Sequence, residues 1–231
     1  MKARLLLIPG HLCDAALWAH QTRHLVDAAD MTVASTDGGS SVDAMARAIL
    51  ARAPARFAMA GLSMGGYIAL EIMRQAPQRV ERLALLDTAA GGNTPTSIER
   101  RRRHMGFIRD GKFEAVLDEF CQMVVPPARF GDAALMDEMR RMMRRIGPDL
   151  AYAQQQAMLD RDDMRPTLGR IACPTLVLCG RQDTLTPLAG HEEIAAGIPG
   201  AKLVVIEDCG HMAPMEKPEA VTAAMRDWLQ A

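Results

Sequence analysis

The sequence predicts an α/β fold, in which a mostly parallel central sheet is flanked by helices and carries a helical cap insertion. Three observations predict it: short apolar runs without in/out alternation, helical patterns between those runs, and one long interruption of the alternation. Continuous apolar runs are typical of strands buried on both faces, as in a parallel sheet covered by helices. Strands that alternate with helices predict right-handed crossovers.

Five apolar runs are expected to be strands, together with a weaker sixth. The five are 4–8, 57–60, 83–86, 175–179 and 203–206, and the weaker run is 31–34. Helices are expected where apolar residues recur along one face. In the regular part of the chain these segments are 64–75, 189–196 and 218–229.

The alternation stops between residues 93 and 170. This stretch is rich in Arg and Met and shows helical spacing at 113–124 and 133–146, with breaks at Pro126-Pro127, Gly147-Pro148 and Pro166. At 231 residues, one core with an inserted sub-domain is expected. We therefore predict a core of residues 1–92 and 171–231 and a cap at 93–170. The many methionines of the cap would either line the top of an adaptable apolar pocket or serve only to pack the cap helices together.

Composition excludes several classes of function. Hydrophobic residues make up 49% and charged residues 24%, and the net charge is -1, which argues against roles that rest on attraction to nucleic acid or anionic membrane. The early apolar run ends at Pro9-Gly10 and is too short for a signal peptide or a membrane span, so a cytoplasmic location is expected. Five scattered cysteines without a CxxC pair predict neither disulfides nor a thiolate metal site.

The motif Gly61-Leu62-Ser63-Met64-Gly65 lies between an expected strand and an expected helix, as a nucleophile elbow requires. A strained turn would expose the Ser63 hydroxyl at the carboxyl edge of the sheet, and the glycines would avoid a Cβ clash. The amide of Met64, at a helix N-terminus, would be free to bind a developing oxyanion. The alternative is a Gly-rich turn that only packs tightly or holds a phosphate.

A serine nucleophile needs a base, and the base needs an acid to orient it. Asp183 follows the strand at 175–179 and His211 follows the strand at 203–206, both at carboxyl ends where α/β sheets build their sites. The order Ser63, Asp183, His211 is the one this architecture uses. Asp87, at the end of the 83–86 strand, is a rival acid. A helix-capping aspartate and a structural histidine are the alternatives to a triad.

These motifs make the chain resemble the α/β-hydrolase fold superfamily, in particular its small esterase-like members with a helical cap. The resemblance rests on 61–66, on Gly180-Arg181-Gln182-Asp183 with Pro187, and on the segment 210–218. The family's usual first two strands have no counterpart, which implies a six-stranded sheet beginning at residue 4.

The same resemblance implies a second oxyanion donor. The segment from Ile8 to Trp18 is similar to the family's His-Gly segment, which ends in Trp. Aligning on Trp18 puts Pro9 where the family has His, and the donor becomes the backbone amide of His11, with Leu12 as the alternative.

The expected reaction is hydrolysis of a small to medium carboxylic ester through an acyl-enzyme on Ser63. It needs no metal and no organic cofactor. The alternatives are a C–C bond hydrolase or lactonase that uses the same triad, and a non-catalytic ligand receptor on the same fold. The expected partner is a small-molecule ester.

Two arginine clusters in the insert are expected to be solvated faces of the cap. They comprise residues 100–103 and Arg140, Arg141, Arg144 and Arg145. A sharper hypothesis is a docking patch for an acidic carrier protein or a carboxylate-bearing substrate.

Overall fold

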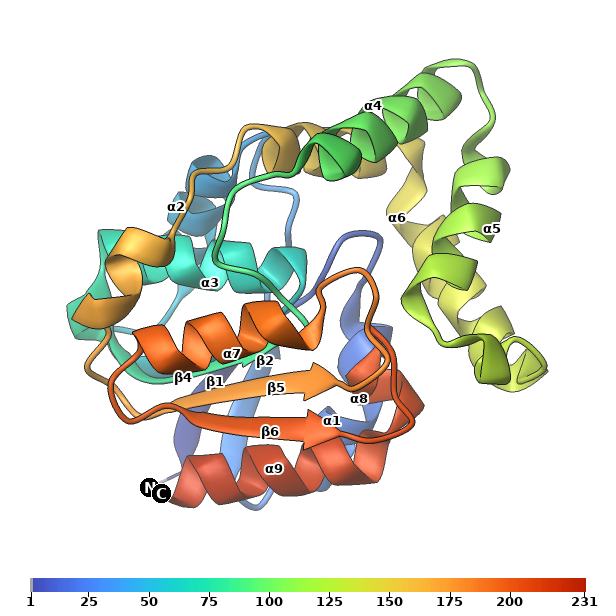
Figure 1. Cartoon of the computed structure of the whole chain (residues 1–231). Coiled ribbons are helices and arrows are strands. Elements are labelled where there is room, and N and C mark those ends of the chain that lie inside the picture. The colour runs from blue at the N-terminus through green and yellow to red at the C-terminus, as the bar shows by residue number, and fades with distance from the viewer. Residues whose placement is uncertain (1) are drawn as a thin grey trace.

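The computed structural model describes residues 2–231, and its centre is a six-stranded sheet in which every neighbouring pair is parallel. The strand order is β2-β1-β3-β4-β5-β6, and helices cover both faces (Figure 1). This confirms the predicted fold class. The strands are β1 (Ala3–Ile8), β2 (Ala29–Val33), β3 (Phe57–Leu62), β4 (Val80–Leu86), β5 (Thr175–Gly180) and β6 (Lys202–Ile206).

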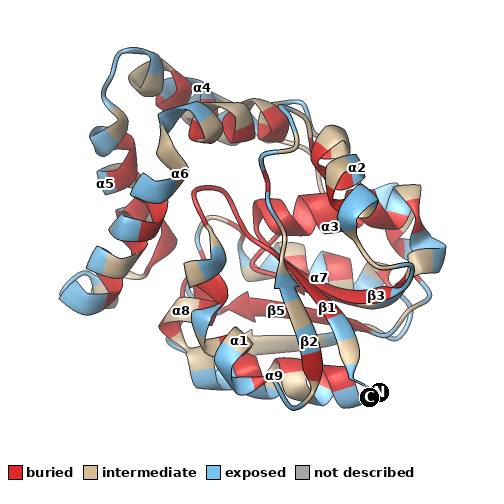
Figure 2. Ribbon diagram, turned by 180° about the vertical axis from the view of Figure 1, so that it is seen from behind, coloured by how far each residue is buried: buried red, intermediate tan, exposed pale blue. Residues whose placement is uncertain are grey.

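The central strands β1, β3, β4 and β5 are buried on both faces over most of their length, which is why they lack in/out alternation. The edge strand β2 differs from the prediction: its residues alternate between exposed and more buried positions, because an edge strand is covered less completely. In β1, Leu5 and Leu7 pack into one hydrophobic cluster, while Leu6 and Ile8 pack into the other. Figure 2 shows the central strands and the neighbouring α3 helix largely buried. In residues 2–231 no helix is both long and apolar enough to span a bilayer.

The helices divide between the two clusters. One face is covered by α1 (Ala19–His24), α8 (Ala213–Glu216) and α9 (Pro218–Gln230). The other face is covered by α2 (Val42–Arg52), α3 (Met64–Gln75) and α7 (Leu188–Gly197). Short 3-10 turns complete the core: η1 (Ala15–Trp18), η2 (Pro77–Arg79) and η4 (Arg165–Arg170).

Three helices follow β4 before the chain returns to the sheet at β5. They are α4 (Pro95–Arg109), α5 (Phe113–Val124) and α6 (Ala133–Leu159), with the turn η3 (Pro127–Arg129) between the last two. Figure 1 shows them beside the carboxyl ends of the strands. We call these three helices the cap. Thr94 and Ser97 start α4 with a reciprocal capping box, and Pro95 occupies its first turn.

The helix expected to end at residue 146 resumes at once, so the predicted break at Gly147-Pro148 is a kink. Gly147 takes φ 75° and ψ 167°, a backbone conformation that interrupts the helix and suits glycine. Pro148 then sits in the first turn of a second helical run, where its missing N–H has no cost. The kink matters because the second run carries Gln154 and Gln155, whose side chains reach the core residue His11.

Candidate active site

Ser63 lies at the junction of β3 and α3 in a strained conformation, with φ 54° and ψ −115°. Its N–H donates to the carbonyl of Leu86 at 2.9 Å, which pins it to the neighbouring strand end. A Cβ on Gly61 would lie 2.3 Å from the carbonyl oxygen of Gly65, and a Cβ on Gly65 would lie 2.1 Å from that of Ile8. The turn therefore accepts only glycine at both positions.

Asp183 and His211 meet at the ends of β5 and β6. The Nδ1 atom of His211 is 2.8 Å from Oδ2 of Asp183, and both side chains are buried. The hydroxyl of Thr186 donates to the same oxygen at 2.6 Å, and the amides of Leu185 and Thr186 donate to Oδ1 at 2.8 and 2.9 Å. Burial opposes the charge on Asp183, but His211 and Thr186 outweigh it and hold the pKa of this carboxyl below its ordinary value.

The loop that carries His211 is held from two sides. Its N–H donates to the carbonyl of Val124 at the end of α5, at 2.9 Å. The buried carboxylate of Glu216 accepts from the amides of Gly210 and Met212 at 3.1 and 3.0 Å. The far ring nitrogen of His211, Nε2, is buried and has no hydrogen-bond partner within residues 2–231. It is thus available to exchange a proton with a reacting group.

Ser63 shares a cavity with Thr186, whose hydroxyl is 3.2 Å from Nδ1 of His211. The structure therefore joins Asp183 to His211 directly, and Thr186, which contacts both, lines the same cavity as Ser63. In the described chain no hydrogen bond links Ser63 to His211. Such catalytic hydrogen bonds commonly tighten only when a substrate is bound.

The structure separates the two sequence candidates for the second oxyanion donor. The amide of Leu12 donates to Oε1 of Gln154 at 3.0 Å, so that N–H is already used. The amides of His11 and Met64 have no acceptor among residues 2–231. Of the two candidates, the His11 amide is therefore the free one.

The His11 ring is also fixed by the cap. Its Nδ1 is 2.8 Å from Oε1 of Gln154, and the amide nitrogen of Gln155 lies 2.9 Å from its Nε2. Because Gln155 donates to Nε2, the ring is neutral and donates from Nδ1. Burial lowers the pKa of His11 to about 3. Sequence reasoning missed both glutamines, which lie beyond the helix end it expected.

Asp87, the rival acid, forms no hydrogen bond or ion pair with His211 in the described part of the chain. Its Oδ1 accepts from the amide of Gly180 at 2.9 Å and its Oδ2 from the amide of Ala213 at 3.4 Å. Burial and the nearby charge of Asp183 raise its pKa well above the ordinary value. Asp87 thereby connects the loops that follow β5 and β6.

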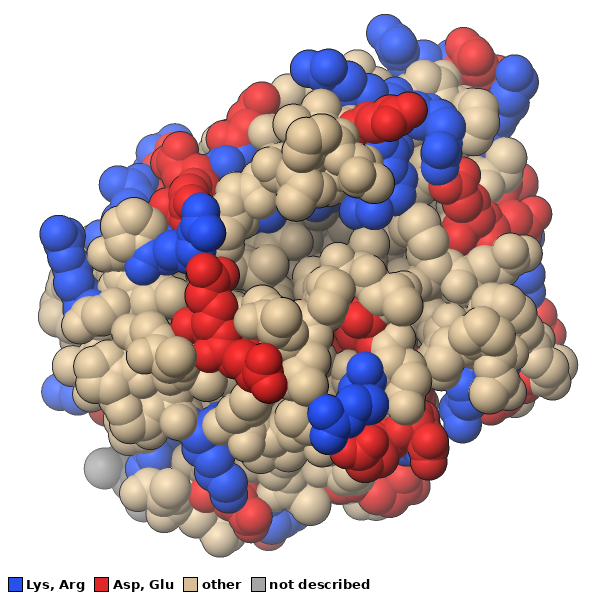
Figure 3. All heavy atoms as spheres, in the orientation of Figure 1, with Lys and Arg blue, Asp and Glu red and all other residues tan. Residues whose placement is uncertain are grey.

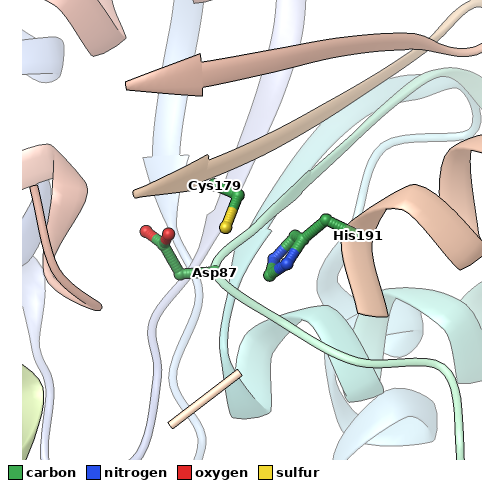
Figure 4. Close-up of side chains that lie close together, drawn as sticks. All are labelled: Asp87, Cys179 and His191. Atoms are coloured by element: carbon green, nitrogen blue, oxygen red, sulfur yellow. The ribbon is translucent and has the colours of Figure 1, made fainter. Parts of the chain in front are cut away.

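Figure 4 shows Asp87 beside Cys179 and His191, three residues whose ligand atoms lie within 4.8 Å of one another. A metal is a poor fit because Nε2 of His191 already accepts from the amide of Thr88 at 2.8 Å. Burial also raises the pKa of the Cys179 thiol and lowers that of His191 to about 4. The cluster is best described as core packing beneath the site.

The cavity at Ser63 has a volume of about 190 Å³ and opens between the core and the cap, where Figure 3 shows a hollow. Of the methionines proposed as a pocket roof, only Met158 lines it. Four others are buried in the packing of α6 against the rest of the cap and core: Met136, Met139, Met142 and Met143.

The second arginine cluster is not a free cationic patch. Each member has an acidic partner: Arg140 with Asp118, Arg141 with Glu138, Arg144 with Glu114, and Arg145 with Asp14. The docking of an acidic carrier protein stays a prediction. From the first cluster, Arg100 and Arg101 line the cavity instead.

The chain is similar to known hydrolases over most of its length. It is 28% identical to a pimeloyl-[acyl-carrier protein] methyl ester esterase of Nitrosomonas europaea, over 78% of this chain and 73% of that protein. It is also 28% identical to a 2-hydroxy-6-oxononadienedioate/2-hydroxy-6-oxononatrienedioate hydrolase of Paraburkholderia xenovorans, over 73% of this chain but only 60% of that protein.

A solved structure of a thermophilic esterase from Thermogutta terrifontis, with malate bound, superposes with a TM-score of 0.90 at 31% identity. The match covers all of this chain and 90% of that one. The model of the alpha/beta hydrolase family matches residues 5–224. With its parallel sheet and its Ser63 turn, the chain thus belongs to the alpha/beta hydrolase family and is a hydrolase.

Proposed function

We propose that this enzyme hydrolyses a small to medium carboxylic ester through an acyl-enzyme on Ser63, with Asp183 and His211 completing the triad. The observation that carries the proposal is the buried Asp183–His211 pair next to the strained Ser63 turn. Nε2 of His211 has no hydrogen-bond partner in residues 2–231, and its Nδ1 is 3.2 Å from the hydroxyl of Thr186, which lines the same cavity as Ser63. Backbone strain at a residue that lines a cavity is typical of functional sites.

The reaction follows from these positions. Nε2 of His211 takes the proton of the Ser63 hydroxyl as its oxygen attacks the ester carbonyl, and the amides of His11 and Met64 stabilise the oxyanion. Asp183 stabilises the imidazolium. The proton then passes from Nε2 to the alcohol as the ester C–O bond breaks. Water, deprotonated by His211, attacks the acyl-enzyme, releases the acid and restores Ser63.

The relatives support cleavage of an ester bond, and they leave cleavage of a C–C bond as an alternative. The Nitrosomonas and Thermogutta proteins are esterases, whereas the Paraburkholderia protein is named as a hydrolase of a 2-hydroxy-6-oxo dioate. A C–C bond hydrolase would use the same three residues. A panel of short and medium acyl esters, lactones and vinylogous diketones distinguishes the bond that is cleaved.

The decisive test is covalent labelling. We expect a fluorophosphonate to add once to the intact protein, at Ser63, with no addition to Ser63→Ala, as read by intact mass. Turnover of p-nitrophenyl acetate by the wild type then separates an enzyme from a ligand receptor on the same fold. A folded wild-type protein that forms no adduct would overturn the proposed function.

A further inference from the structure

The cavity at Ser63 is unusual in its charge. Three arginines line it: Arg100 and Arg101 from α4, and Arg161 from just beyond α6. No Asp or Glu is among the lining residues from the described chain. Figure 3 shows Lys and Arg atoms along the cap side of the hollow. A small pocket with several positive charges and no negative one favours an anionic ligand.

Arg101 is the most buried of the three, with 7% of its surface exposed. Its partners are all neutral: Nε donates to Oδ1 of Asn93 at 3.2 Å, and Nη1 lies 3.0 Å from the sulfur of Met158 and 3.5 Å from Oε1 of Gln155. Burial lowers the pKa of Arg101 to about 10, so the guanidinium remains charged at neutral pH. Buried charges in proteins are normally paired with an opposite charge.

Arg161 also has an unfilled donor. Its guanidinium lies over the ring of Tyr67, 4.1 Å from the centroid, and Nη1 donates to the carbonyl of Gly91. Its Nε atom is buried and has no acceptor in residues 2–231. Acidic residues line a neighbouring hollow, but in the described chain none reaches within 4.0 Å of the Arg161 nitrogens. They are Asp43, Glu71, Asp160 and Asp162.

Other arginines of the same region show that this lack of acids is local. Arg103, two residues beyond Arg101 on α4, pairs with Glu119, and Arg144 on α6 pairs with Glu114 in a bidentate geometry. The acidic partners are thus present where arginines face solvent and missing where they face Ser63.

We propose that the substrate is an ester that also carries a free carboxylate, which Arg101 and Arg161 bind while the ester carbonyl lies at Ser63. This rests on the proposed function for the Ser63 chemistry. A planar guanidinium matches a carboxylate with two parallel hydrogen bonds, and Arg100 adds positive charge at the same wall. The volume of about 190 Å³ favours a short chain between the two groups, such as a half-ester of a small dicarboxylic acid.

Binding can be measured without catalysis. In the Ser63→Ala protein, we expect glutarate to bind in calorimetry at low salt. Losing a charge-assisted contact should weaken this binding by about 10- to 100-fold in Arg101→Met and in Arg161→Met. Arg102→Met is the matched control, because Arg102 is exposed on the same helix and lines a different hollow. Its affinity for glutarate should equal that of the parent.

Kinetics give the second readout. Monomethyl glutarate is compared with methyl 4-carbamoylbutanoate, a neutral substrate of nearly the same shape. We expect kcat/KM of the wild type to favour the anion, and the Arg101→Met substitution to lower that preference by about 10- to 100-fold. Arg102→Met, outside the cavity, should keep the wild-type preference for the anion, whereas a merely structural role of Arg101 would lower kcat/KM for both esters equally.

The outcomes separate the two proposals. No glutarate binding and no preference for the anionic ester, in a protein that labels at Ser63, overturns the carboxylate subsite and leaves the ester hydrolase intact. If glutarate binding depends on the arginines but Ser63 is not labelled, the ester hydrolase proposal is overturned and the carboxylate subsite stands. If Arg101→Met fails to fold, Arg161→Met and the wild-type preference decide the question.

Discussion

The two walls of the cavity are built in different ways. On the core wall, the cavity-lining Ser63 and the Asp183 carboxylate behind Thr186 are held by backbone groups, such as the Leu86 carbonyl and the Thr186 amide. On the cap wall, Arg101 is held only by side chains, and one donor of Arg161 has no partner within residues 2–231. Under the proposed function, the core would hold the reacting atoms in place, and the cap would select the part of the substrate away from the ester bond.

The strongest test of this difference removes a charge from the core side while keeping the shape of the side chain. Asp183→Asn should lower kcat by about 10³- to 10⁴-fold, because an amide cannot stabilise the imidazolium. Binding of substrate and the melting temperature should change little. Steady-state kinetics and thermal denaturation check both.

Asp208→Asn is the control for that prediction. Asp208 is exposed on the loop before His211, and its φ of 51° is one that Asn tolerates. We expect wild-type kcat. A value of kcat for Asp183→Asn within about tenfold of wild type would show that the acid lies elsewhere, with Asp87 the first candidate.

The second test concerns the hydrogen bonds that connect the cap to the core at Gln154. Gln154 of the cap is fully buried and accepts from both the His11 ring and the Leu12 amide. Gln154→Leu leaves these two buried donors unpaired, which should reduce the free energy of unfolding by about 2–4 kcal/mol. It should also lower kcat, since the loop with the His11 amide loses its support. Urea denaturation and p-nitrophenyl acetate turnover measure the two effects.

Gln156→Leu provides the matched control one helical position away from the core-facing pair. Its side chain is half-buried and bonds only to Asp160. If this variant lost as much stability as Gln154→Leu, the special role of the buried contact would be refuted.

The smallest expected effect concerns acid sensitivity of the core wall. His191 has a pKa of about 4 in the folded protein against 6.5 when unperturbed, because burial opposes its charge. Between these values the unfolded chain binds more protons, so stability is full above pH 6.5 and falls as the pH drops towards 4. His191 alone should account for a loss of about 2 kcal/mol between pH 7 and pH 5.

His191→Gln should therefore flatten the stability curve over that range, as read by urea denaturation at the two pH values. His24→Gln, at an exposed position, should leave the curve unchanged. Identical acid sensitivity in the wild type and His191→Gln would mean that the buried ring is not responsible.

Local patterns sufficed for the sheet and for the positions of Ser63, Asp183 and His211. The central strands are buried on both faces, so their apolar runs are visible in the sequence. The weaker run at 31–34 overlaps the edge strand β2, which is only partly buried. The helix α2 was missed, although Ser41, which accepts from the Ala44 amide, is a recognisable N-cap.

The cap wall could not be predicted in the same way. Arg101 and Arg144 both belong to arginine-rich helical segments, and only the fold shows that one faces the cavity while the other meets Glu114. Gln154 and Gln155 lie beyond a Gly-Pro pair that normally ends a helix. Their contacts with His11 span more than 140 residues, a separation at which local periodicity carries no information.

The hydrogen bond from the His211 amide to the Val124 carbonyl has a consequence for modular redesign. A Cβ on Gly210 would lie 2.8 Å from Cδ of Pro126, so the two segments also touch sterically. A cap taken from a relative would place a different carbonyl and different side chains against the loop that carries His211. Chimeras that graft the insertion should therefore also carry the matching 210–216 segment, because otherwise the His211 side chain would be displaced.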